Sequence, residues 1–161
     1  MKKVIRSAII LVCALIAGKG VLFAEPLPAE LAQEERFALG LGLEWNMNSR
    51  RNFGGAAVTG FDYSFNDFAV GLKFTVSYNF NNITVLEPKA LFRWYFFGNI
   101  FAQADIGASF ILEQIQNTPM FLGGLRGGIR IPLGEMLFIE PYGRFGYPFA
   151  FGFGAITGIR W

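Results

Sequence analysis

The chain has 161 residues, enough for one domain, with a formal net charge of +2, 53% hydrophobic, 17% aromatic and only 16% charged residues. Soluble domains average about 25% charged residues, and a charge this small without a basic stripe gives no basis for binding nucleic acid. The chain has no histidine and one cysteine, which removes the usual general base, the commonest zinc ligand and a disulfide framework. We therefore expect no enzyme, no catalytic residue, no cofactor and no bound metal.

Residues 1–24 have the pattern of a secretory signal peptide. A basic start at 2–6 is followed by an apolar stretch that is too short to cross a membrane as a helix. Cleavage is expected after Ala24 or after Gly20, and Cys13 would be removed with the peptide. The acidic residues 25–35, which include two prolines, are expected to form a periplasmic lead-in, and the remaining residues 36–161 to form the folded domain.

The folded domain repeats one pattern, in which large apolar residues alternate with small or polar residues for about a dozen positions before a turn. Alternation with period two is typical of a β-strand. In the clearest segment, 68–80, one set is Phe, Val, Leu, Phe, Val, Tyr and Phe, and the other is Ala, Gly, Lys, Thr, Ser and Asn. Eight such segments follow one another, at 37–47, 53–65, 68–80, 86–96, 100–112, 120–133, 137–147 and 150–161.

Eight is an even number, as in single-chain bacterial barrels, and each segment reaches the 9–11 residues that a tilted strand needs to cross the hydrocarbon. The sequence predicts an all-β fold, an eight-stranded antiparallel up-and-down transmembrane β-barrel after an N-terminal signal peptide. The second, fourth and sixth connections, at 66–67, 97–99 and 134–135, are tight, whereas the first, third and fifth are longer. If both termini are periplasmic, the tight connections are periplasmic too.

The alternation also fits a soluble barrel of the lipocalin kind, with its apolar face turned inward. Two features favour lipid outside. The polar face consists largely of Gly, Ala, Ser and Asn rather than the Lys and Glu of a water-facing surface. Every charged residue within the eight segments also lies on that small face, as expected where an Arg or Lys exposed to lipid costs roughly 2–4 kcal/mol at the bilayer midplane. We therefore expect outer-membrane lipid to surround the barrel.

The segment pattern, the signal peptide and the C-terminal residues Thr157-Gly158-Ile159-Arg160-Trp161 resemble those of small eight-stranded bacterial outer-membrane proteins such as OmpX and the transmembrane domain of OmpA. OmpW proteins are a more distant comparison. The resemblance implies a location in the outer membrane of a Gram-negative bacterium. It also implies that Ile159 and Trp161 belong to the signal read by the barrel assembly machinery. The outer-membrane barrel enzymes resemble one another in using histidine, which this chain lacks.

An eight-stranded barrel has an interior just wide enough for side chains, so inward charges must pair or meet trapped water. The predicted lumen network consists of Lys73, Lys89, Arg93, Asp105, Arg126, Arg130, Glu140 and Arg144. Asp105 is expected to pair with both Arg93 and Arg126, because its strand lies between theirs.

The main interpretation is a structural envelope protein with a charged, salt-bridged and largely plugged lumen. One alternative is a narrow gated channel for small solutes, whose positive excess would favour anions. The other is a surface interaction protein, which the short loops count against.

Overall fold

The computed structural model describes residues 36–47, 53–79, 83–112, 119–147 and 151–161. The signal peptide, the lead-in and the longer connections lie outside the described residues. The strands are β1 (Arg36–Met47), β2 (Phe53–Phe65), β3 (Phe68–Asn79), β4 (Ile83–Phe97), β5 (Ile100–Ile111), β6 (Met120–Ile129), β7 (Ile131–Leu133), β8 (Leu137–Tyr147) and β9 (Phe151–Arg160).

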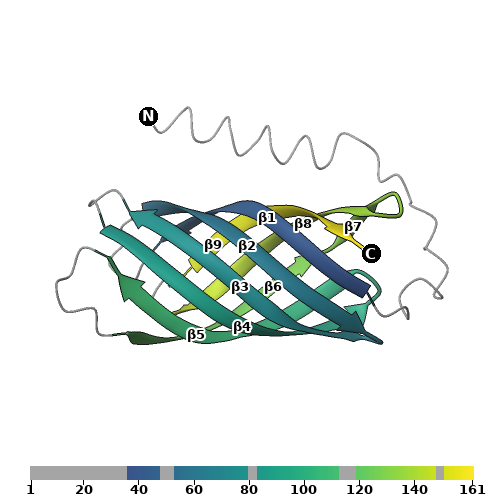
Figure 1. Cartoon of the computed structure of the whole chain (residues 1–161), viewed down its shortest axis with the longest axis horizontal. Coiled ribbons are helices and arrows are strands. Elements are labelled where there is room, and N and C mark those ends of the chain that lie inside the picture. The colour runs from purple at the N-terminus through teal and green to yellow at the C-terminus, as the bar shows by residue number, and fades with distance from the viewer. Residues whose placement is uncertain (1–35, 48–52, 80–82, 113–118, 148–150) are drawn as a thin grey trace. The chain divides into compact units, whose positions relative to one another are not determined.

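Each strand pairs antiparallel with its neighbours, and the pairings of β1 with β9 and of β6 with β8 close the sheet on itself. β6 and β7 are two parts of one strand, interrupted at Arg130. Both keep the same register against β8, where Gly128 lies opposite Tyr142 and Ile131 opposite Ile139. The molecule is therefore a closed barrel of eight antiparallel strands, which confirms the predicted fold. Figure 1 shows the strands crossing the barrel at a tilt, as closure requires.

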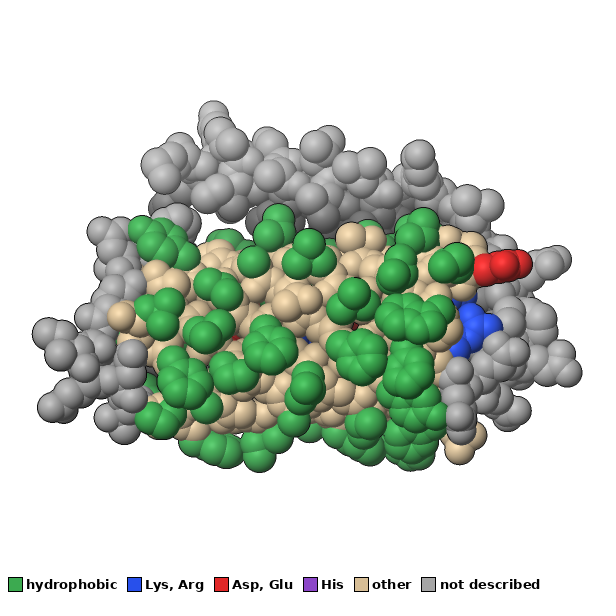
Figure 2. All heavy atoms as spheres, viewed as in Figure 1, with side chains coloured by type: hydrophobic (Ala, Val, Ile, Leu, Met, Phe, Trp, Pro, Cys, Tyr) green, Lys and Arg blue, Asp and Glu red, His purple; other side chains and the backbone are tan. Residues whose placement is uncertain are grey.

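The two faces of the wall are those that the alternation predicts. Along β3, Leu72 and Phe74 are about half exposed on the outside, whereas Lys73 and Thr75 between them are buried inside. The same alternation of exposed large apolar and buried small or polar residues runs through the other strands. Apolar side chains spread over the visible wall in Figure 2, and the protruding charges on this face lie at one end.

The end of the barrel that carries the tight connections between β2 and β3, β4 and β5, and β7 and β8 is named here the turn end. Asn66 has a φ of 50° and Gly98 a φ of 56°, the left-handed conformation that Asn and Gly tolerate best. The opposite end, toward which β1, β3 and β5 run, is named the loop end. β4 begins three residues earlier than expected, at Ile83, and a register shift between Tyr95 and Phe97 interrupts its pairing with β5.

Candidate functional site

The lumen holds the only concentration of chemistry-bearing side chains among the described residues. All eight residues of the predicted network point into it. Seven of them are at most 9% exposed, and the side chain of the eighth, Arg144, is also 9% exposed. Three carboxylates outside the predicted set, Glu44, Asp62 and Glu87, are buried beside them.

The half of the lumen nearer the turn end contains a group of short hydrogen bonds, named here the tight cluster: Asp62, Arg93, Gln103, Arg130 and Glu140. Arg93 donates to both carboxylate oxygens of Glu140, at 2.8 and 2.9 Å. It also donates to Gln103 Oε1, at 2.7 and 3.0 Å. Arg130 donates to Glu140 at 2.9 Å and to both oxygens of Asp62 at 2.7 and 3.0 Å. Two arginines are thus matched by two carboxylates, and the members come from β2, β4, β5, β8 and the junction of β6 with β7.

Aromatic rings enclose the two arginines of the tight cluster. The Arg93 guanidinium lies 4.1 Å from the centre of the Phe101 ring, and the Arg130 guanidinium lies 4.5 Å from that of Phe138. Arg93 also donates to the hydroxyl of Tyr95 at 2.9 Å. Phe101 and Phe138 are 1% exposed and belong to the apolar core of the lumen. The tight cluster therefore combines charge pairing with dense packing across the barrel.

The half nearer the loop end contains longer contacts, named here the loose cluster: Glu44, Glu87, Lys89, Asp105, Arg126 and Arg144. Its short contacts join Lys89 to Glu87 at 2.6 Å and Arg144 to Glu44 at 2.9 Å. Arg126 lies 3.6 Å from Glu44 and 3.7 Å from Asp105, and none of its three guanidinium nitrogens makes a hydrogen bond. Its guanidinium instead stacks 3.8 Å from the centre of the Tyr142 ring.

The two clusters form one continuous chain of polar contacts. Arg144 lies 3.6 Å from Glu87, so Glu87 links it to Lys89, and Glu44 links it to Arg126. Gln103 donates to Asp105 and accepts from Arg93, which joins the loose cluster to the tight one. Of the eight predicted residues, only Lys73 stands outside this chain.

The structure corrects the expected pairing of Asp105. It approaches Arg126 but not Arg93, which pairs with Glu140 instead. Glu140 instead accepts hydrogen bonds from two arginines, Arg93 and Arg130. Gln103, Tyr95 and Tyr142 join the network although the sequence did not single them out. All three alternate with outward apolar residues, so the sequence pattern could have placed them on the lumen side.

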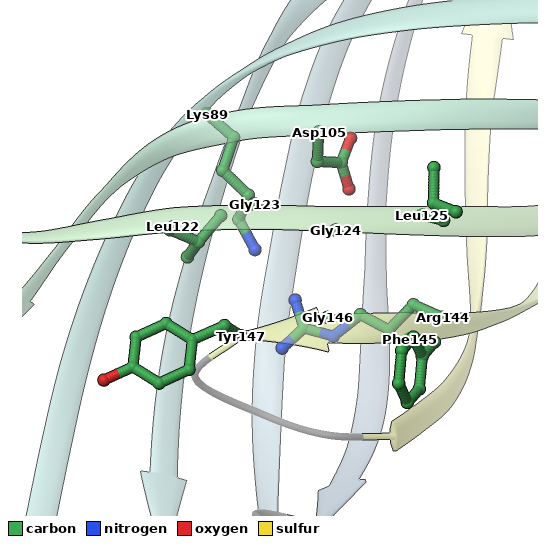
Figure 3. Close-up of a pocket in the computed structure, with 10 residues that line it drawn as sticks. All are labelled: Lys89, Asp105, Leu122, Gly123, Gly124, Leu125, Arg144, Phe145, Gly146 and Tyr147. Carbon is green, nitrogen blue, oxygen red and sulfur yellow. The ribbon is translucent and has the colours of Figure 1, made fainter.

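Gly123 and Gly124 of β6 lie opposite Tyr147 and Gly146 of β8. A cavity of about 10 Å³, close to the space of one water, lies there. Lys89, Asp105 and Arg144 reach it from three strands across the Gly123–Gly124 backbone (Figure 3). At Gly128 on the same strand, a methyl group would crowd Phe101 and Tyr142 at 2.8 and 2.9 Å. Gly128 thus leaves room for two lumen side chains.

The predicted assembly residues lie at the end of β9. Ile159 and Trp161 are both exposed on the apolar face. The backbone of Trp161 exchanges two hydrogen bonds of 3.0 Å with Phe37, which extends the pairing of β1 with β9 to the last residue. Their part in recognition by the assembly machinery stays a prediction.

In the described part of the chain, no three His, Cys, Asp or Glu side chains are grouped to hold a metal ion. No helix among the same residues is long and apolar enough to span a membrane.

No protein-family profile matches the sequence, and no curated protein resembles it significantly. Solved structures do resemble the barrel. Neisserial surface protein A superposes with a TM-score of 0.53 at 11% identity, over 78% of this chain and 95% of that one. The Yersinia pestis outer membrane protein Ail, studied in a phospholipid bilayer nanodisc, gives 0.52 at 11% identity over 80% and 100%. The designed barrel TMB2.3 gives 0.50 at 14% identity over 80% and 97%. At these identities the likeness concerns the fold.

Proposed function

We propose that this chain is a structural protein of the bacterial outer membrane, whose barrel is filled by its own side chains and neither conducts steadily nor catalyses a reaction. The observation that carries the proposal is the tight cluster. Its two arginines and two carboxylates are joined by hydrogen bonds of 3.0 Å or less between strands far apart in sequence. A solute crossing the lumen would have to break these bonds between buried groups.

The location is supported by the outer surface of the barrel. Its exposed residues are large and apolar along every long strand, as expected for a surface that contacts hydrocarbon rather than water. Aromatic residues gather near both ends, with contacting rings of Phe37, Tyr63 and Trp161 at the turn end and of Trp45 and Phe153 near the loop end. Such girdles are typical of membrane–water interfaces. The fold shared with Ail, an outer membrane protein, agrees with this location.

Cell fractionation tests the location. The mature protein should sediment with the outer membrane and migrate faster on gels before boiling than after, because a closed barrel resists detergent until heated. Recovery from the soluble periplasm would contradict the proposal and favour the lipocalin-like alternative.

Planar-bilayer recording of the purified, refolded protein tests the absence of conductance. A flat baseline over the usual range of potentials is expected. Reproducible discrete openings would overturn the filled-lumen proposal and favour a narrow channel, and anion selectivity of those openings would agree with the positive excess of the lumen.

A further inference from the structure

Lys73 is the one lumen cation that the network leaves out. Its side chain is buried, with 1% of the residue exposed, and its amine makes no hydrogen bond. Among the described residues it forms no ion pair, and its nearest recorded partner is the ring of Tyr142, whose centre lies 6.0 Å from Nζ. A buried charge without a partner is rare, because desolvation of the ion is not repaid.

The neighbouring strands explain why Lys73 lacks a carboxylate. On β2 its cross-strand neighbour is Gly60, which has no side chain, and on β4 it is Lys89, a second cation. The nearest carboxylate along β4 is Glu87, which is bound by Lys89 at 2.6 Å and approached by Arg144 at 3.6 Å. On β2 the nearest carboxylate is Asp62, which Arg130 binds at 2.7 Å, so the nearest acids on both neighbouring strands are bound by other cations.

The buried charges of the lumen do not cancel. Among the described residues the buried carboxylates are Glu44, Asp62, Glu87, Asp105 and Glu140, and the buried cations are Lys73, Lys89, Arg93, Arg126, Arg130 and Arg144. The tight cluster is balanced, so the excess of one positive charge belongs to the half of the lumen nearer the loop end.

Uncharged polar groups in the same half also lack partners. Thr75 and Ser77, the next inward residues along β3, have buried hydroxyls without a hydrogen bond, and so does the side-chain amide of Asn46 on β1. Buried polar atoms in native proteins nearly always have a partner, and where they do not, an ordered water or ion is a usual explanation. Hydroxyl and amide hydrogens can both donate to an anion.

We propose that this half of the lumen binds one small monovalent anion, of the size of chloride or bromide, at the amine of Lys73. The single excess charge matches one monovalent ion. The carboxylates of Glu44 and Asp105, 3.6 and 3.7 Å from Arg126, disfavour an anion of higher charge. Arg126, whose nitrogens have no hydrogen bonds, lies against the same Tyr142 ring as Lys73, at 3.8 Å compared with 6.0 Å from the ring centre, so a second cation lies near the amine.

Lys73 packs over Gly60, since a methyl group added at that glycine would meet Lys73 Cε at 3.5 Å, an ordinary contact. The proposal does not depend on the lumen being closed, because a resident anion is compatible with a filled barrel and with a channel.

Diffraction from crystals of the refolded barrel grown in bromide tests the proposal directly. An anomalous peak beside Lys73 Nζ is expected in the wild type. An empty position, or a water without anomalous signal, would overturn the proposal without any variant being needed.

Thermal unfolding in detergent gives the solution test. At equal ionic strength, bromide should raise the wild-type Tm above its value in gluconate, and Lys73→Met, which removes the charge at similar volume, should abolish that difference. The control is Arg160→Met, which also removes one positive charge but at the turn end, outside the two clusters, where Arg160 donates to backbone oxygens; it should keep the bromide effect. A bromide effect that persists in Lys73→Met, or is absent from the wild type, would refute the site.

Discussion

Arg93 and Glu140 form a two-pronged ion pair inside the barrel, with nitrogen–oxygen distances of 2.8 and 2.9 Å, although 47 residues separate them in the chain. Both residues are 1% exposed. The same carboxylate accepts a hydrogen bond from Arg130 at 2.9 Å. Glu140 thus binds two arginines through hydrogen bonds of 2.9 Å or less.

Replacing Glu140 with Ala should lower the free energy of unfolding by about 3–5 kcal/mol, because it leaves buried arginines without their shared counter-charge. Equilibrium unfolding in urea with lipid vesicles measures this. Glu135→Ala is the control, since Glu135 is exposed at the turn end and its change should stay within about 0.5 kcal/mol. Equal effects at the two positions would mean that the tight cluster contributes nothing to stability.

Asp105→Ala should cost less than Glu140→Ala, about 1–3 kcal/mol. Asp105 lies 3.7 Å from Arg126 and accepts one side-chain hydrogen bond, from Gln103. Adding Arg126→Met should restore part of the loss, because it removes the cation left short of negative charge. A double-mutant cycle measures this coupling. Strictly additive losses would show that the two side chains do not interact.

Two inward glycines on adjacent strands should respond differently to a methyl group. At Gly71 the new Cβ would overlap the backbone oxygen of Phe61 and approach Asp62 Cα at 2.7 Å, whereas at Gly60 its nearest contact is Lys73 Cε at 3.5 Å. Gly71→Ala should therefore destabilise the barrel by about 1–3 kcal/mol, and Gly60→Ala should be tolerated. Comparison of their unfolding midpoints checks this, and the reverse order would contradict the described packing of β2 against β3.

An arginine on the outer face should destabilise the barrel more the deeper it lies in the bilayer. Leu72 lies within β3 and is 54% exposed, and Phe97 lies at the turn end and is 75% exposed. Leu72→Arg should cost about 2–4 kcal/mol if the bilayer midplane lies there, and Phe97→Arg about 0–1 kcal/mol near the interface. Refolding into vesicles measures both. Equal tolerance would mean that this face does not contact hydrocarbon.

The alternation in the sequence was sufficient to predict the strands and which residues face the lumen, because successive side chains of a strand point to opposite sides of the sheet. It placed Lys73 inside and Leu72 outside, as observed. It also predicted one continuous sixth strand, which the shared register of β6 and β7 against β8 confirms.

The contacts within the lumen could not be predicted in the same way. Which inward residues meet depends on strand stagger and on closure between distant strands. Counting along the chain placed Asp105 near Arg93, whereas Arg93 reaches across the barrel to Glu140 on β8. The isolation of Lys73 has the same origin, because only the register sets Gly60 and Lys89 on either side of it.

The claim that side chains of the tight cluster close the lumen is tested most directly by single-channel recording of the wild type beside Arg93→Ala/Glu140→Ala. This double variant removes one charge of each sign, so the net charge of the lumen is unchanged while the Arg93–Glu140 ion pair of the tight cluster is lost. The account predicts a flat baseline for the wild type and discrete openings for the variant. Wild-type openings of the same size and frequency as those of the variant would contradict it.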